Sequence, residues 1–228
     1  MTSMSHHIRH LPAAAVLIAA GAGATHITAS DQLDLASATQ SVCTAHATIT
    51  IDLRMELAEL GWVHPQPENM ISVLRLWADG VLAVGRELRA PVDWTTAPAQ
   101  AESTAIQVFG GEERDNVIRL TIGPNTAALA VIQSSGEETQ SLRCIYAGPG
   151  DDNLRDLLNT LESLDERAGI KRADPHVQTF QSRTQGEEDG KPYLVDLQVA
   201  RFEESAASSL GREPHVELGF STIFTSIP

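Results

Sequence analysis

The chain has 228 residues, with 16 basic and 30 acidic side chains and a formal net charge of −14 at pH 7. Its 42% hydrophobic and 20% charged residues are typical of a soluble globular protein and exclude a disordered chain. The acidic balance, without any basic cluster longer than two charges, argues against a nucleic-acid-binding protein because phosphate would be repelled. We therefore expect one or two folded domains and no nucleic-acid partner.

An apolar stretch, Leu11 to Ala24, follows a tail that carries Arg9. One interpretation is a cleaved secretory signal, because Ala22 to Ala24 has the A-x-A form of a cleavage site. The other is a buried helix that begins at Pro12, a residue tolerated in a first helical turn, and the downstream pattern favours this second interpretation. The stretch is shorter than the roughly 20 apolar residues of a membrane helix. No other segment qualifies, so we expect no membrane span.

Three amphipathic helices are predicted between residues 30 and 80. The first begins after Ser30 and Asp31, which are suitable N-caps, and the second ends at Gly61, a natural left-handed stop. Prolines in the loop His64 to Pro67 separate it from the third helix, which we place at Glu68 to Asp79. The apolar residues at helical spacing are Leu33, Leu35, Ala36, Val42 and Cys43 in the first helix, Leu53, Leu57 and Leu60 in the second, and Met70, Ile71, Val73, Leu74 and Trp77 in the third.

After Gly80 the hydrophobic period changes to two, which predicts β-strands. The turns between these strands are short, and this favours antiparallel pairing because parallel strands need a crossover of about a dozen residues. A helix from Asn153 to Leu164 separates two sets of strands. The strands of the first set are Val84 to Leu88, Thr104 to Phe109, Val117 to Ile122, Ala127 to Gln133 and Gln140 to Tyr146, with a Pro- and Ala-rich loop from Pro91 to Ala101 between the first two. The strands of the second set are Val177 to Ser182, Tyr193 to Phe202 and Val216 to Ile223, with a polar hairpin at Gln185 to Gly190.

This order predicts an α+β fold of antiparallel β-meanders in two quasi-equivalent halves, with helices packed on the sheet. We predict a single domain over residues 1–228, with a helical part at 30–80, a first β-meander plus helix at 84–164 and a second β set at 176–226. Asp151 and Asp152 precede the helix of the first half. We interpret them as caps rather than as an acid–base pair, because a helix N-terminus favours negative charge.

Cys43 and Cys144 are too few for a disulfide framework or for a zinc site of four thiolates. We interpret them as free thiols that pack as small buried hydrophobic groups, with a single bridge as the alternative if the protein is exported. Cys43 and His46 have a zinc-like spacing but no second pair of ligands. We expect no metal and no cofactor.

No motif in the sequence assembles a catalytic site, since it has no phosphate-binding loop, no G-x-G-x-x-G, no H-E-x-x-H and no G-x-S-x-G elbow. We therefore expect no enzyme, and a site that collects His64, His176 and His215 is kept as an alternative. A sheet without catalytic groups favours binding through a sheet edge or an uncovered face, and an open edge would also allow a homodimer.

The segment Met55 to Ala90 resembles the EspG family of type VII secretion-associated chaperones of mycobacteria and other actinobacteria. In that family a helix ending in a glycine is followed by a proline-containing loop, a second apolar helix and a strand that ends in x-L-R. The corresponding residues here are Leu57 to Gly61 with Trp62, the loop His64 to Pro67, the helix around Val73 to Trp77, and Glu87 to Arg89. The strands and the helix that follow are similar to the two halves of an EspG protein.

The resemblance implies a single EspG-like domain: a non-enzymatic, cytoplasmic chaperone that binds PE/PPE-like secretion substrates and keeps them soluble for export. The alternative from the residues is an exported or cell-envelope binding protein with a cleaved signal and one disulfide. For the partner surface we predict the strand Tyr193 to Phe202, with Tyr193, Asp196, Gln198 and Phe202 as contact residues. Charge reversal at Asp196 should then weaken binding without lowering the melting temperature.

Overall fold

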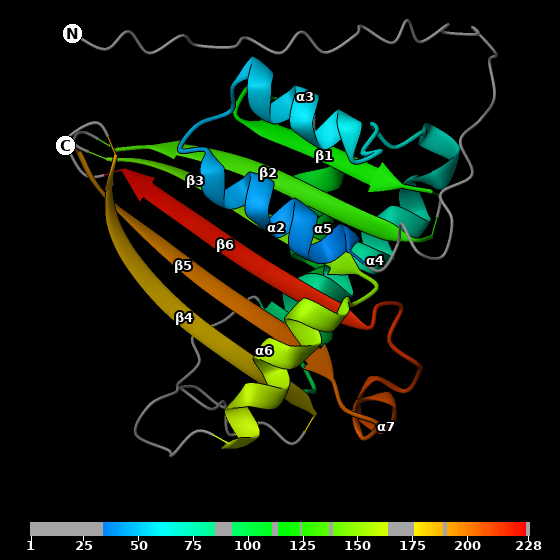
Figure 1. The fold of residues 1–228 in the computed structure, drawn as a ribbon. Helices are drawn as coiled ribbons and strands as arrows, with labels where there is room; N and C mark the ends of the chain where they lie inside the picture. The colour runs from blue at the N-terminus through cyan, green and yellow to red at the C-terminus, as the bar shows by residue number, and fades with distance from the viewer. Residues whose placement is uncertain are drawn as a thin grey trace, which may run out of the picture.

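The computed structural model describes residues 34–84, 93–110, 114–123, 125–136, 139–163, 176–188 and 191–226. Within them a six-stranded antiparallel sheet lies between two layers of helices (Figure 1). The strand order is β1-β2-β3-β6-β5-β4, so two three-stranded meanders meet where β3 pairs with β6. The predicted α+β fold is confirmed. The strands are β1 (Val117–Ile122), β2 (Ala127–Ser135), β3 (Gln140–Gly148), β4 (Val177–Glu188), β5 (Lys191–Phe202) and β6 (Leu218–Ser226).

Helices cover both faces of the sheet (Figure 1). One face, called the α2 face, packs against α2 (Leu35–Ala45), α3 (Ile51–Glu59) and α6 (Asp152–Ser163). The other, called the α4 face, packs against α4 (Met70–Val84) and α5 (Ala97–Phe109). A 3₁₀ turn, η1 (Pro67–Asn69), precedes α4, and a short helix, α7 (Ala206–Leu210), lies between β5 and β6. Successive strand residues point to opposite faces, so each face carries every second side chain.

Each face has its own aromatic core. On the α2 face Tyr146 stacks on Phe220, with ring centroids 4.9 Å apart, and its hydroxyl donates to the carbonyl of Pro149. On the α4 face Trp77 packs against Phe109 at 5.1 Å and donates its indole N–H to the carbonyl of Ile145. Burial on both faces explains why β2 is a continuous apolar run, since its first five residues are all buried.

The glycine expected to end the second predicted helix acts as a stop, and a cap not predicted from the sequence begins this helix. The hydroxyl of Thr50 accepts a hydrogen bond from the backbone N–H of Leu53 and so caps α3. Gly61 follows α3 with a φ of 88°, a left-handed conformation that glycine adopts without steric cost. The expected caps Ser30 and Asp31, the tail histidines and the apolar stretch 11–24 lie outside the described residues.

The predicted strand Thr104 to Phe109 is wrong, because these residues form the second half of α5. Pro98 stands in the first turn of this helix, where proline is tolerated, so the predicted loop ends earlier than expected. Four buried residues recur at helical spacing and form its inner stripe: Ala97, Ala101, Ala105 and Phe109. Because three of the four residues are small alanines, the sequence pattern alone does not distinguish a helix from a strand here. The segment packs as a helix against α4.

The third predicted helix continues beyond Asp79 to Val84. Gly80 lies inside α4 and does not end it. At this residue α4 packs so closely on the sheet that there is no room for a side chain, because a Cβ atom on Gly80 would collide with that of Ala147. Val84 is therefore helical, and the rest of the predicted strand 84–88 lies outside the described residues. In the second set β4 continues to Glu188, so part of the predicted polar hairpin is strand.

No helix among the described residues is long and apolar enough to cross a membrane.

Candidate functional site

The four predicted contact residues do not share one surface. Tyr193 lies on the α2 face, where it stacks on Phe224 with ring centroids 5.0 Å apart. Asp196, Gln198 and Phe202 differ from Tyr193 by an odd number of residues and so lie on the α4 face. Phe202 is partly buried there and packs against an apolar cluster of α4 and α5. Whether any of the four residues contacts a partner stays a prediction. Tyr193 lies on the opposite face of the sheet from the other three and so cannot form one contact surface with them.

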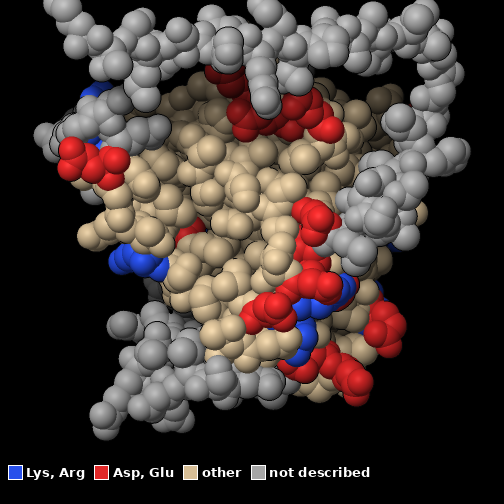
Figure 2. Space-filling view, in the orientation of Figure 1, with Lys and Arg blue, Asp and Glu red and all other residues tan. Residues whose placement is uncertain are grey.

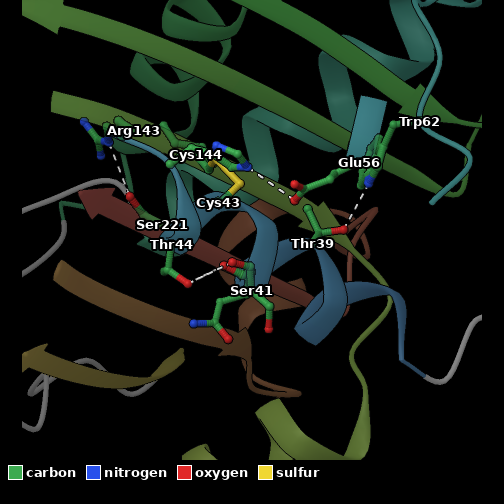
Figure 3. Close-up of a disulfide and its surroundings, with 12 residues drawn as sticks. Thr39, Ser41, Cys43, Thr44, Glu56, Trp62, Arg143, Cys144 and Ser221 are labelled. Atoms are coloured by element: carbon green, nitrogen blue, oxygen red, sulfur yellow. Dashed lines mark hydrogen bonds and ion pairs between the residues drawn. A yellow bond between two sulfur atoms is a disulfide. The ribbon is translucent and has the colours of Figure 1, made fainter. Parts of the chain in front are cut away.

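Asp196 and Gln198 lie in a polar region of the α4 face that spans four strands. Gln198 is opposite Gln181 of β4 and Ser221 of β6, and the hydroxyl of Ser221 accepts a hydrogen bond of 3.3 Å from Nε of Arg143 on β3 (Figure 3). We call Arg143, Ser221, Gln198 and Gln181 the polar row. The row lies on the face opposite the bond between Cys43 and Cys144, because Arg143 and Cys144 are adjacent in β3.

Asp196 lies beside this row but is already paired. Its carboxylate accepts a hydrogen bond of 2.6 Å from Nε of Arg183 and a second one, of 3.3 Å, from Nη2 of the same guanidinium. These bonds raise the pKa of Arg183, chiefly through the hydrogen bond to Asp196. Arg183 lies on the outermost strand and its side chain is largely exposed, so the pair is an ordinary surface ion pair.

Arg143 differs from Arg183 in its surroundings. Burial lowers the pKa of its guanidinium, and no carboxylate of the described residues lies within ion-pair distance of it. The amides beside it are also incompletely bonded, since Oε1 of Gln181 and Nε2 of Gln198 are buried without a hydrogen-bond partner. Buried charges and amides are normally paired, so the guanidinium and the two amides of this region can form further hydrogen bonds.

The carboxylate of Asp79, in contrast, is fully hydrogen-bonded within the fold. Its buried carboxylate accepts two hydrogen bonds from Arg212, at 2.6 and 2.9 Å, and two from the backbone N–H and Nδ1 of His215, at 2.7 and 2.9 Å. The hydrogen bond to Asp79 raises the pKa of Arg212. His215 lines a hollow of about 270 Å³ with Ser72, Arg75, Leu76 and Asn125. The four bonds fasten the chain before β6 to α4, which is a structural role.

The three histidines of the enzyme alternative lie in three different environments. His215 contacts Asp79, as described above. His176 contacts the hydroxyls of Ser205 and Ser209 through its two ring nitrogens and packs edge-on against Trp94. His64 lines a separate hollow with Pro65, Met70, Val117 and Arg119. The structure therefore does not bring these histidines together in one site.

Asp151 caps a helix, as the sequence indicated. Its carboxylate accepts the backbone N–H of Leu154 in the first turn of α6 and also the N–H of Ser37 in the first turn of α2. One buried side chain thus ties two helix N-termini together. Asp152 is exposed and pairs with Arg155, so the two aspartates do not form an acid–base pair.

The two cysteines form a disulfide, so the expectation of free thiols is wrong (Figure 3). Cys43 lies on the inner side of α2 and Cys144 on the strand beneath it, with Cα atoms 6.1 Å apart and a sequence separation of 101. Both residues are completely buried. Neither spacing nor composition could reveal the pair, because α2 approaches β3 only in the folded chain. The bond also excludes Cys43 as a zinc ligand with His46, which contacts Glu56 instead.

Comparison of the chain with known protein families, curated proteins and solved structures finds no match in any of the three. The EspG resemblance therefore stays a prediction.

Proposed function

We propose that the chain is a non-enzymatic binding protein that works in an oxidising compartment outside the cytosol. The observation that carries this proposal is the disulfide between Cys43 and Cys144. Disulfides persist in secreted and envelope proteins and are rare in the cytosol, where thiols are kept reduced. The apolar stretch Leu11 to Ala24 agrees with it, because one of its two interpretations is a secretory signal.

The hydrogen-bond partners of the buried polar side chains favour binding over catalysis. The buried carboxylates of Asp79 and Asp151 are bonded to the fold and hold its helices in place. The polar row, in contrast, has buried polar atoms without hydrogen-bond partners, and such atoms can bind a ligand.

The experiment is intact mass spectrometry of the protein purified from separate fractions of its own host, with and without alkylation. The proposal expects a chain trimmed near Ala24 in the extracytoplasmic fraction, alkylated at both cysteines only after reduction. A C43A/C144A variant, which cannot be alkylated, is the control. A full-length chain in the cytosol that is alkylated twice without reduction would contradict the proposal.

A second candidate is the cytosolic chaperone for PE/PPE-like substrates that the resemblance implies. It is favoured by the outer edge of β4, which pairs with β5 along 12 residues and with no other strand of the described residues. Such an edge can accept a strand of a partner or of a second copy. The face towards the viewer in Figure 2 is largely uncharged at its centre, with charged side chains around it.

The test is a pull-down from the host, with an established family member as the positive control. A Thr184→Lys variant places a charge on the β4 edge, and Ser103→Lys on the exposed surface of α5 is its matched control. The chaperone interpretation expects recovery of a secretion substrate that is lost only in the Thr184→Lys variant. Sedimentation of the same proteins tests the homodimer, which only the Thr184→Lys variant should dissociate. Recovery of no substrate alongside a working control would exclude the chaperone.

A further inference from the structure

Arg143 is a cation without a counter-charge among the described residues. Of its five N–H donors only Nε bonds to a described residue, through the hydroxyl of Ser221. Across the α4 face, Ile223 of β6 is opposite both Arg143 on β3 and Asp196 on β5. The carboxylate of Asp196 is already held by Arg183 and forms no ion pair with Arg143. The two Nη groups of Arg143 thus make no hydrogen bond to the described residues.

The neighbours of Arg143 complement an external anion. Ser221 and Gln198 are directly opposite each other on β6 and β5, and the Gln198 amide has a buried N–H group without an acceptor. Gln181, opposite Gln198 on β4, has a buried amide oxygen without a donor. Guanidinium and amide donors therefore lie at one end of the polar row, and an acceptor lies at the other.

We infer that the polar row binds the carboxylate of a small organic acid, with Arg143 as its anchor. The inference rests on the proposed binding function and names the class of ligand. The planar guanidinium fork matches the two oxygens of a carboxylate, and Gln198 can donate to the same group. Gln181 can accept from a hydroxyl or amino group next to it. A single cation in a chain of net charge −14 favours a monoanion over doubly charged phosphate.

The experiment compares thermal unfolding of the full chain in sodium acetate, sodium lactate, sodium phosphate and sodium chloride at pH 7 and equal ionic strength. Acetate and lactate should raise the melting temperature in a saturable way, and phosphate less so. Arg143→Met should weaken the apparent carboxylate affinity by about tenfold or more, as expected for loss of a charge-assisted bidentate contact. Arg54→Met removes the same charge from the exposed surface of α3, on the other side of the sheet, and should leave the affinity unchanged.

A second measurement does not depend on the variants folding. In the ¹⁵N-labelled wild type, acetate should shift the Nε–H signal of Arg143 and the side-chain amide of Gln198, whereas chloride should not. Equal effects of acetate on wild type and Arg143→Met, or unshifted signals, would overturn the inference. A protein that is exported and disulfide-bonded but binds no carboxylate would overturn this inference alone. A reduced cytosolic chain that binds acetate through Arg143 would overturn only the compartment proposed above.

Discussion

At the scale of single residues, Asp79 shows how a buried charge stabilises this fold. It is 1% exposed and accepts four hydrogen bonds from Arg212 and His215. Asp79→Asn should cost about 2–4 kcal/mol of unfolding free energy, because it leaves the guanidinium of Arg212 without its counter-charge. Urea denaturation measures this cost. Asp196→Asn is the matched control at an exposed pair and should cost less than about 1 kcal/mol. Equal losses of unfolding free energy in both variants would show that burial does not determine how much each ion pair contributes to stability.

Glu217 gives a prediction of pH dependence. Burial acts to raise the pKa of its carboxyl, but hydrogen bonds from Arg155 and from the backbone N–H of Gly150 outweigh burial and lower the pKa. A lowered pKa in the folded state contributes stability above the ordinary value of 4.5, and this contribution is lost as the pH falls through the folded pKa. Glu217→Gln should therefore be less stable than wild type at pH 7, and the difference should shrink below pH 4.5 in urea titrations. A difference that does not change with pH would exclude the charge as its cause.

At the scale of elements, the crossing of α4 over the sheet depends on Gly80. Glycine inside a helix normally costs about 1 kcal/mol relative to alanine, so Gly80→Ala would stabilise an isolated helix. Here the added Cβ would collide with that of Ala147 on β3, so we expect a net loss of about 1–3 kcal/mol instead. The measurement is a thermal or urea double-mutant cycle with Ala147→Gly. The pair should show a favourable coupling energy, and additive effects would show that the two residues do not meet.

At the scale of the whole molecule, the disulfide joins the helical part to the sheet. It closes a loop of about 100 residues, for which the chain-entropy model gives about 4–5 kcal/mol of stabilisation. Wild type treated with reductant and the C43A/C144A variant should both unfold at a lower urea concentration. The variant should not respond to reductant, which makes it the control. An unchanged midpoint in reduced wild type would mean that core packing alone holds α2 on β3.

The whole molecule also decides which polar residues can act together. The sequence indicated Asp196 and Gln198 as a binding surface but missed Arg143 and Ser221, which lie in distant segments. A signal for Arg143 was present, since a charged residue stands between Leu142 and Cys144 in a strand that is otherwise largely buried. Its importance could not be judged, because only strand pairing shows that no acid lies opposite it.

Elements whose signals are local could be predicted from the amino-acid sequence. Strands β1, β3, β5 and β6, the helix that contains Leu154 and Leu158, the turn at Gly61 and the cap at Asp151 all lie within a few residues of where these signals predict them, because backbone sterics and capping act over a few residues. Four features could be seen only in the folded chain: Thr104 to Phe109 is helical, α4 continues through Gly80, the cysteines pair, and Arg143 lies beside Ser221 and the two glutamines. Each of these depends on contacts between segments far apart in sequence, and such contacts exist only once the sheet has formed.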